Sequence, residues 1–378
     1  MLFRALLRQQ EQNPVYYIRG KSSILNGTES FVISYRLPNN TNQNNVTEKV
    51  PTDAEGNWEI EYTGKKILSL QSFAFNKSTL LTCDLTAADD FAELTNLGAS
   101  GLTYGAFRQC SNLTSVTFGS GHVWGKLVSC RNLFQLATSL TSADIGNIDF
   151  SKVTDCYRMC YQTKLTAIDF GNQDLAKVSS WNEAFALCAN LTSVNMRYAT
   201  LEAATNTVSM FQYCSLLTSL DLSNATFANV ANTTSMFQYC SSLTSLDLSN
   251  ATFAKANTNT SIFSDCTALV ILKLPKANFS QAAALNGFVR YCNALTTIKC
   301  GPAQTYGNPS ASNIPFNSVE SPLSYQSIYD IAVWLCDKTG QSSARFTVNR
   351  TAWNALTAAE QTTIIGIVTS KNWNLATA

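Results

Sequence analysis

Apolar residues in the middle of the chain recur with a period of about 26 positions, and polar residues occupy fixed places between them. The block MFQYCSLLTSLDL begins at Met210, and MFQYCSSLTSLDL begins at Met236. Such a period indicates stacked repeats, because a single unit of this length cannot bury its own apolar edge. The frame L-x-x-L-x-L starts at Leu80, Leu113, Leu140, Leu165, Leu191, Leu217, Leu243, Leu269 and Leu295. The pattern therefore predicts a leucine-rich-repeat solenoid of about nine turns.

Each frame predicts a short strand whose leucines point inward, and stacking would pair these strands into a parallel sheet with a spacing of about 4.8 Å. The segment before the repeated cysteine, such as 232–240, predicts one or two helical turns on the opposite side, with Ser and Thr as N-caps. The predicted fold class is an α/β repeat solenoid with a parallel β-sheet, a small N-terminal β domain and an α/β C-terminal cap.

Cysteines follow the same period as the leucines. The recurring thiols, each 26 positions from the next, are Cys188, Cys214, Cys240, Cys266 and Cys292. We interpret them as small buried hydrophobic residues. A ladder of disulfides or metal ligands is the alternative, but no histidines accompany the thiols. Cys156 and Cys160 lie one helical turn apart, and two thiols alone are a weak metal signal, so an incidental pair is the favoured interpretation.

The run MFQYCSSLTSLDLSNATF, from Met236, resembles the BspA-like leucine-rich-repeat family, whose tandem units follow the pattern MFxxCssLtsLdLsnf. The resemblance covers roughly residues 68–300. It implies a protein on the surface of bacteria or of their phages that works in adhesion and binding. The family has no common catalytic residues, so the resemblance implies none here. The sequence departs from the pattern within 119–163, where the cysteine position falls on Ala137 and Gln162.

Changes in composition and in the pattern of apolar and polar residues divide the chain into four predicted regions. They are an N-terminal peg or tail at 1–12, a small β domain at 13–66, the solenoid at 67–303 and a C-terminal α/β cap at 304–378. Alternation of apolar and polar residues in the β domain predicts strands at 15–18, 31–37 and 57–62, with a polar loop at 38–53. We expect this domain to cover the N-terminal end of the solenoid, which would otherwise expose its core.

The chain begins with a short apolar stretch that Arg4 and Arg8 interrupt, which does not fit a secretory signal. We therefore expect no export by the usual secretory route, and a reducing compartment for the twelve cysteines. The segment could form a short amphipathic helix that attaches the chain to other virion proteins. A frayed tail is the alternative. The candidate attachment residues are Leu2, Phe3, Leu6 and Leu7.

The C-terminal flank changes to a mixed pattern after a turn-rich linker at 301–315. Ser321 followed by Pro322 predicts the start of a helix that ends near Gly340. A strand is expected at 345–348, and Thr357 with Glu360 predicts a capping box that opens a helix toward Lys371. Residues 373–375 predict a closing strand, so this region would seal the last turn.

Composition narrows the function classes. Only 13% of the residues are charged and the net charge is +1, so no global field would attract nucleic acid. No apolar run reaches the length of about 20 residues that membrane insertion requires. The one histidine, His122, has no evident acid or nucleophile partner, and common catalytic and nucleotide-binding motifs are missing. We therefore expect a protein without catalytic residues, metal or cofactor.

The outward positions of the predicted strands form rows of hydroxyl and charged side chains. The candidate binding face consists of Thr192, Ser193, Asn195, Thr218, Ser219, Asp221, Thr244, Ser245, Asp247 and Lys273. It would be a concave polar face of the kind solenoids often use. Alternatively these residues only suit and solubilise a pleated surface. Tyr213, Tyr239 and Tyr291 recur beside the cysteines and predict a ridge on the opposite side, which would cover the core or bind a partner.

These features predict a non-enzymatic binding and display protein. The favoured hypothesis is a phage fibre or decoration protein on the virion surface that contacts a host surface protein or glycan, with other virion proteins as partners and homo-oligomerisation left open. A bacterial cell-surface adhesin whose signal sequence is missing is the first alternative. A glycan-active enzyme within one of the flanks is the second.

Overall fold

The computed structural model describes most of the repeat region and parts of both flanks. The described residues are 17–36, 42–61, 66–69, 78–86, 94, 97, 105–120, 124–279, 287–301, 313–314, 322–335, 339 and 343–377. The predicted attachment segment with Leu2, Phe3, Leu6 and Leu7 lies outside them, as do His122 and most of the predicted linker.

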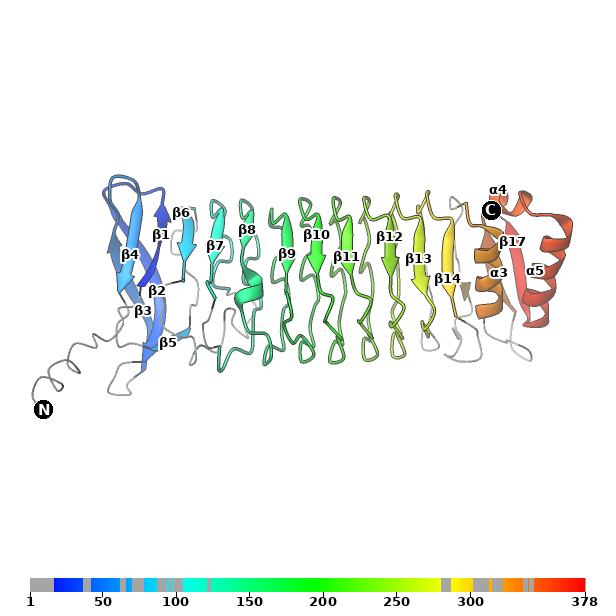
Figure 1. The fold of residues 1–378 in the computed structure, drawn as a ribbon, viewed down its shortest axis with the longest axis horizontal. Helices are drawn as coiled ribbons and strands as arrows, with labels where there is room; N and C mark the ends of the chain where they lie inside the picture. Colours follow the sequence, from blue (N-terminus) through cyan, green and yellow to red (C-terminus); the bar gives the residue numbers. More distant parts are fainter. Residues whose placement is uncertain are drawn as a thin grey trace, which may run out of the picture.

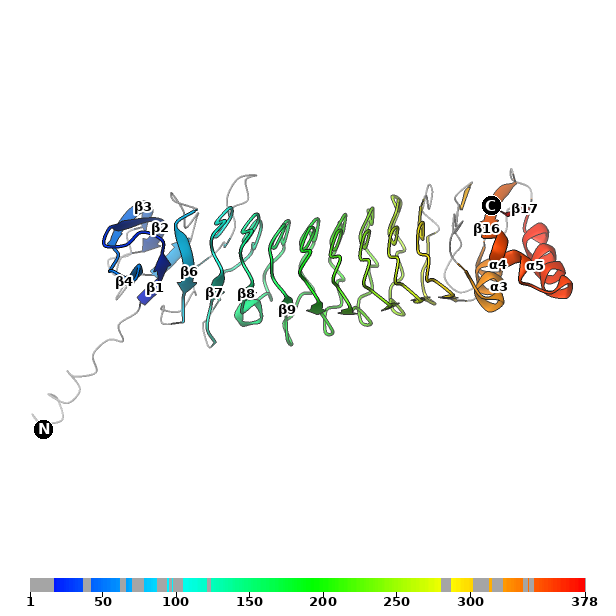
Figure 2. The same cartoon turned by 90° about the horizontal axis from the view of Figure 1, so that it is seen from above.

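The repeats form a solenoid whose turns stack along one axis (Figure 1). The turns contribute the strands β7 (Ser115–Thr117), β8 (Ser142–Ala143), β9 (Ala167–Asp169), β10 (Ser193–Asn195), β11 (Ser219–Asp221), β12 (Ser245–Asp247), β13 (Ile271–Leu274) and β14 (Thr297–Cys300). Strands pair in parallel and in register within three groups, β7 with β8, β9 to β11, and β12 to β14. Ser193 lies opposite Ser219 in the second group, and Ser245 lies opposite Ile271 in the third. The prediction of a leucine-rich-repeat-like solenoid is confirmed. The stack runs nearly straight in both views, so the strand face is flatter than the predicted concave surface (Figures 1 and 2).

Identical side chains stack from turn to turn to form the core. All nine frame leucines are buried, and none is more than 1% exposed. Phe237 stacks between Phe211 and Phe263, with ring centroids 5.6 and 5.4 Å away. A second row places Phe227 against Phe253 at 5.3 Å. The 26-residue period thus aligns aromatic rings into continuous columns, which no single turn could bury alone.

The segment opposite the strands is not helical, so that part of the prediction is wrong. Thr207, Ser209, Phe211 and Tyr213 donate their backbone N–H groups to carbonyl oxygens of the next turn at 2.8–3.2 Å. The N–H groups of Met210 and Gln212 donate back over three residues within their own turn, and that of Val208 donates to the side chain of Asn206. This alternation requires left-handed backbone at Ser209 and Tyr213, with φ of 53° and 62°. A helix would satisfy these groups within one turn, whereas this arrangement uses half of them to join neighbouring turns.

The repeated cysteines add a second link between turns. The thiols of Cys214, Cys240 and Cys266 donate hydrogen bonds of 3.1–3.2 Å to the carbonyl oxygens of Phe185, Phe211 and Phe237 in the preceding turns. All described cysteines are free thiols. Burial raises the pKa values of these three thiols, so they stay protonated and can donate. The repeated residue is therefore a buried hydrophobic residue that also donates a hydrogen bond.

One turn in the irregular region is a residue shorter than its neighbours. The sequence pattern placed the cysteine position of this turn on Gln162, and that prediction is wrong. Gln162 has the left-handed backbone, with φ of 57°, that Leu187 adopts just before Cys188. Thr163 takes the cysteine position, is 3% exposed, and lies 3.4 Å from the thiol of Cys188. Leu140 and Leu165 are 25 residues apart rather than 26, so counting back from Leu165 gives Gln162 instead of Thr163.

The N-terminal strands continue the solenoid sheet. The strand β1 (Tyr17–Ser22) pairs antiparallel with both β4 (Asn57–Glu61) and β6 (Leu80–Asp84), and β6 pairs in parallel with β7. A second sheet contains β2 (Thr28–Arg36), β3 (Asn42–Pro51) and β5 (Lys66–Ser69), with β2 in the middle. The predicted polar loop at 38–53 is thus wrong, because residues 42–51 form a strand whose backbone pairs with β2. Its polar side chains concealed the strand from a hydrophobicity pattern.

Where the structure describes the C-terminal flank, it shows a three-stranded parallel sheet and three helices. Its elements are β15 (Asn313–Ile314), α3 (Tyr325–Trp334), β16 (Ala344–Val348), α4 (Arg350–Asn354), α5 (Ala358–Ser370) and β17 (Trp373–Thr377). The Thr357–Glu360 capping box is present. The first helix starts later than predicted, because Ser324 rather than Ser321 is its N-cap. Trp334 of α3 contacts Phe279 edge-on at 6.1 Å and so covers the last aromatic column.

Candidate functional surfaces

The predicted strand-face residues lie on one side of the solenoid, but much of their hydrogen-bonding capacity is used within the structure. Thr192 and Thr218 donate their hydroxyls to backbone carbonyls of the preceding turn, at 2.8 and 3.2 Å. Asn195 donates its side-chain amide to Asp169 at 2.8 Å. Asp221 accepts hydrogen bonds from Ser223, two residues later, and so helps to end its strand. The contacts of Thr192, Thr218 and Asn195 thus connect neighbouring turns, whereas that of Asp221 stays within its own turn.

The charged end of the strand row is paired in the same way. Lys273 donates to Asp247 at 2.7 Å, and Ser249 donates to the same carboxylate. Burial opposes ionisation of Asp247, but the hydrogen bonds from Lys273 and Ser249 outweigh it and lower its pKa. Thr244, Ser219 and the other predicted positions are exposed or half-buried on the same face. Where the row changes from acidic to basic residues, Asp247 and Lys273 therefore form an ion pair between neighbouring turns.

Replacing Lys273 with Met should raise the pKa of Asp247 toward its ordinary value, because the largest favourable partner of the carboxylate is lost. A depressed carboxyl pKa stabilises the fold above the unfolded-state value, and that stabilisation is lost as the pH falls through the folded pKa. Since both side chains are about 40% exposed, the pair should contribute only about 0.2–1 kcal/mol. A carboxyl-carbon NMR titration of wild type and variant checks this; an unchanged Asp247 pKa contradicts it.

The opposite side of the solenoid, the turn face, presents aromatic side chains. Tyr213 and Tyr239 stack in adjacent turns with ring centroids 4.4 Å apart and planes at 9°, and Tyr213 is 41% exposed. Asp265 occupies the same position in the next turn, and its charge together with Tyr213 raises the pKa of Tyr239. Arg290 then lies over Tyr291 at 4.5 Å and donates to its hydroxyl. The tyrosine ridge predicted from sequence thus continues into a paired arginine and tyrosine.

Earlier turns carry a related cluster on this face. Arg131 lies 4.0 Å from the ring of Tyr157, and Arg158 lies 5.0 Å from the rings of both Tyr157 and Tyr161. Arg158 also forms an ion pair with Glu183 at 2.9 Å. Burial disfavours the charged guanidinium, but Glu183 outweighs it and raises the pKa of Arg158. Sequence inspection missed this cluster, because these residues lie in turns that depart from the repeat pattern.

The backbone at the tyrosine position is left-handed, with φ of 62° at both Tyr213 and Tyr239. This conformation costs a residue with a Cβ about 1–2 kcal/mol, and asparagine or glycine adopts it more readily. Gln109 and Leu136 adopt it in earlier turns, so the fold requires the conformation but not the ring. An exposed tyrosine at a position of backbone strain favours a role for the side chain itself.

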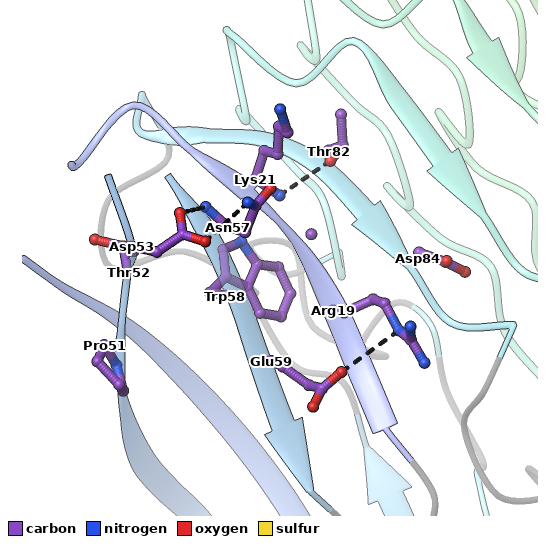
Figure 3. A pocket seen from close by; sticks show the side chains of 11 residues that line it. Arg19, Lys21, Pro51, Thr52, Asp53, Asn57, Trp58, Glu59, Thr82 and Asp84 are labelled. Carbon is purple, nitrogen blue, oxygen red and sulfur yellow. Dashed lines mark hydrogen bonds and ion pairs between the residues drawn. The ribbon is translucent and has the colours of Figure 1, made fainter. Parts of the chain in front are cut away.

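A pocket of about 740 Å³ lies in the N-terminal domain, where β1, β4 and β6 meet (Figure 3). Its polar lining residues are Arg19, Lys21, Thr52, Asp53, Asn57, Glu59, Thr82 and Asp84. Hydrogen bonds from the side chain and backbone of Asn57 lower the pKa of Asp53. The described residues contain no group of three or more His, Cys, Asp and Glu side chains suited to a metal ion. None of the helices in the described parts of the chain is long and apolar enough to cross a bilayer.

Comparison with known proteins places the repeats in context. Residues 124–198 and 169–272 match the family described as "Mycoplasma protein of unknown function, DUF285". These segments overlap and together cover less than half of the 378 residues. Among solved structures, the chain is similar to one described as "Functional domain of InlJ from Listeria monocytogenes includes a cysteine ladder". The identity is 12%, the TM-score is 0.22, and the match covers 78% of this chain and 77% of that one. No curated protein matches the chain.

Proposed function

We propose that the chain is a non-enzymatic, BspA-like binding and display module, and that the turn face contacts the partner. The observation that carries this proposal is the stacked pair of exposed Tyr213 and half-buried Tyr239, held in left-handed backbone and continued by Arg290 and Tyr291. Tyrosine and arginine are enriched at the positions that contribute most to binding. On the strand face, by contrast, Thr192 and Thr218 bond to the preceding turns, and Lys273 pairs with Asp247 of its neighbouring turn.

The location that we propose is the surface of a virion, where the chain would contact a host surface protein or glycan. A bacterial cell surface is the alternative, and the resemblance of the repeats to BspA-like units is compatible with either setting. Mass spectrometry of purified particles should detect the chain as a structural component. Its absence from particles, together with its recovery in the cell envelope, would contradict the virion location.

The double variant Tyr213→Ser/Tyr239→Ser should lower binding to the proposed partner about tenfold or more, because truncation of aromatic residues at an interface carries the largest losses. Fluorescently labelled full chain is added to a panel of intact bacterial strains, and bound label is measured by flow cytometry. Both tyrosines lie on the surface side of buried columns, so thermal unfolding of the variant should resemble that of the wild type.

The matched control is Ser219→Ala/Ser245→Ala, which changes two aligned residues on the opposite face. We expect this variant to bind as the wild type does. If the serine variant loses binding and the tyrosine variant keeps it, the strand face is the contact surface and the turn-face proposal is wrong. If the wild type labels no strain in the panel, the proposed binding role itself is contradicted.

A further inference from the structure

The pocket in the N-terminal domain is lined by a regular grid of polar side chains on three paired strands. Arg19 lies between its strand partners Glu59 and Asp84, and Lys21 lies between Asn57 and Thr82. Figure 3 shows both rows, with Arg19 between the two carboxylates and Lys21 beside Thr82. Strands lie about 4.8 Å apart and alternate residues about 7 Å apart. The grid therefore measures about 10 by 7 Å, an area large enough for one sugar unit with its substituents.

The two cations in the grid are used differently. Arg19 has a carboxylate neighbour, since its Nε lies 3.8 Å from Glu59. The ammonium group of Lys21 has no hydrogen bond or ion pair with any residue that the structure describes; only its backbone N–H bonds to Thr82. An ammonium group carries three donors and no acceptor. Lys21 is therefore available to bind one anionic group of a ligand.

The rest of the lining selects against a strongly anionic ligand. Asp53, Glu59 and Asp84 are three acids against two bases, so the lining carries an excess of one negative charge. A dianion such as phosphate would meet about twice the repulsion from these carboxylates that a single carboxylate meets. Carboxylates accept hydrogen bonds, and Asn57 and Thr82 can both donate and accept them. This set suits a ligand with a single carboxylate and several hydroxyl donors.

We propose that this pocket binds a sugar that carries one carboxylate, of the uronic or sialic acid type, with the carboxylate on Lys21 and the hydroxyls on Asp84, Asn57 and Thr82. The cavity of about 740 Å³ falls within the range of roughly 300–1,000 Å³ typical of small-molecule sites. This extends the proposed function, since it gives the N-terminal domain a glycan subsite separate from the turn face.

The test uses the full chain and isothermal titration with D-glucuronate, N-acetylneuraminate, D-glucose and inorganic phosphate. At least one of the two acidic sugars should bind with a Kd on the order of 1 mM or tighter. Glucose should bind about tenfold more weakly, because it offers no carboxylate to Lys21. Glucose binding as tightly as the acidic sugars, phosphate binding more tightly than they do, or no saturable binding of either acidic sugar would overturn the proposal.

Variants locate the site. Lys21→Met should weaken binding of the acidic sugar about tenfold, while Lys21→Arg should largely preserve it. The control is Lys255→Met, which removes a solenoid lysine whose ammonium bonds to Asn229, and it should leave binding unchanged. Unchanged affinity in Lys21→Met would overturn the assignment. The result is independent of the Tyr213/Tyr239 experiment, because the two variants alter different domains and each can fail alone.

Discussion

The variant Phe237→Ala should lose about 3–5 kcal/mol of unfolding free energy, the usual cost of truncating a fully buried phenylalanine. Phe237 is 0% exposed and stacks on Phe211 and Phe263 from the turns on either side. Removing the ring leaves a cavity that three turns share, and the columns on both sides prevent it from closing. Urea denaturation followed by circular dichroism measures the loss.

The matched control for this prediction is Gln238→Ala, the next residue in the sequence, whose half-buried side chain pairs with Gln212 near the surface. It should change the free energy of unfolding by about 0.5 kcal/mol or less. Each turn of a solenoid is stabilised by its contacts with the neighbouring turns. In Phe237→Ala, hydrogen exchange at the backbone amides of Phe211 and Phe263 should therefore become faster as well. If Phe237→Ala lowers the free energy of unfolding no more than Gln238→Ala does, the stacked rings do not stabilise the solenoid as proposed.

The variant Glu29→Ala should cost about 3 kcal/mol, because it removes a buried acceptor from two hydroxyl donors. Glu29 is 2% exposed, and its carboxylate accepts hydrogen bonds from Ser22 at 2.6 Å and Thr79 at 2.9 Å. Ser22 ends β1, and Thr79 directly precedes β6. The carboxylate therefore connects the second N-terminal sheet to the start of the solenoid.

Chemical denaturation of Glu29→Ala and Glu29→Gln measures how much of the stability depends on an acceptor oxygen at this position. The glutamine keeps an acceptor oxygen in place, so it should recover part of the loss. Glu59→Ala removes an exposed carboxylate of the same domain and should change stability by less than about 1 kcal/mol, since its partner Arg19 is also exposed. Equal effects for Glu29→Ala and Glu59→Ala would mean that the junction does not depend on the buried carboxylate.

The apolar period was enough to predict the solenoid, its inward leucines and the parallel register, because these follow from side chains that must stack to leave water. The turn segment could not be predicted in the same way. Its backbone alternates between links within a turn and links across turns, and the left-handed residues are as varied as Leu187 and Tyr213. A helical period and this arrangement place buried side chains at similar spacings, so hydrophobicity alone does not separate them.

The candidate surfaces, too, could be predicted from the sequence only in part. The outward rows of Thr218 and Asp247 could be read from the repeat, but their hydrogen bonds to the preceding turn or to Lys273 depend on three-dimensional spacing. The cluster around Arg158 lies in turns of irregular length, which hides its alignment. The grid around Lys21 joins strands that are far apart in sequence, β1 with β4 and β6, so no local motif marks it.

Disulfide formation between aligned strand positions tests the central claim, that residues 26 positions apart lie side by side in adjacent turns. In Ser193→Cys/Ser219→Cys the two positions are register partners on β10 and β11. Their separation of about 4.8 Å suits a disulfide. In Ser193→Cys/Ser245→Cys the positions are two turns apart, about 10 Å, which is too far. Under mild oxidation, mass spectrometry should find a disulfide within the first double variant and none in the second; a disulfide in the second, or none in the first, contradicts the stacking.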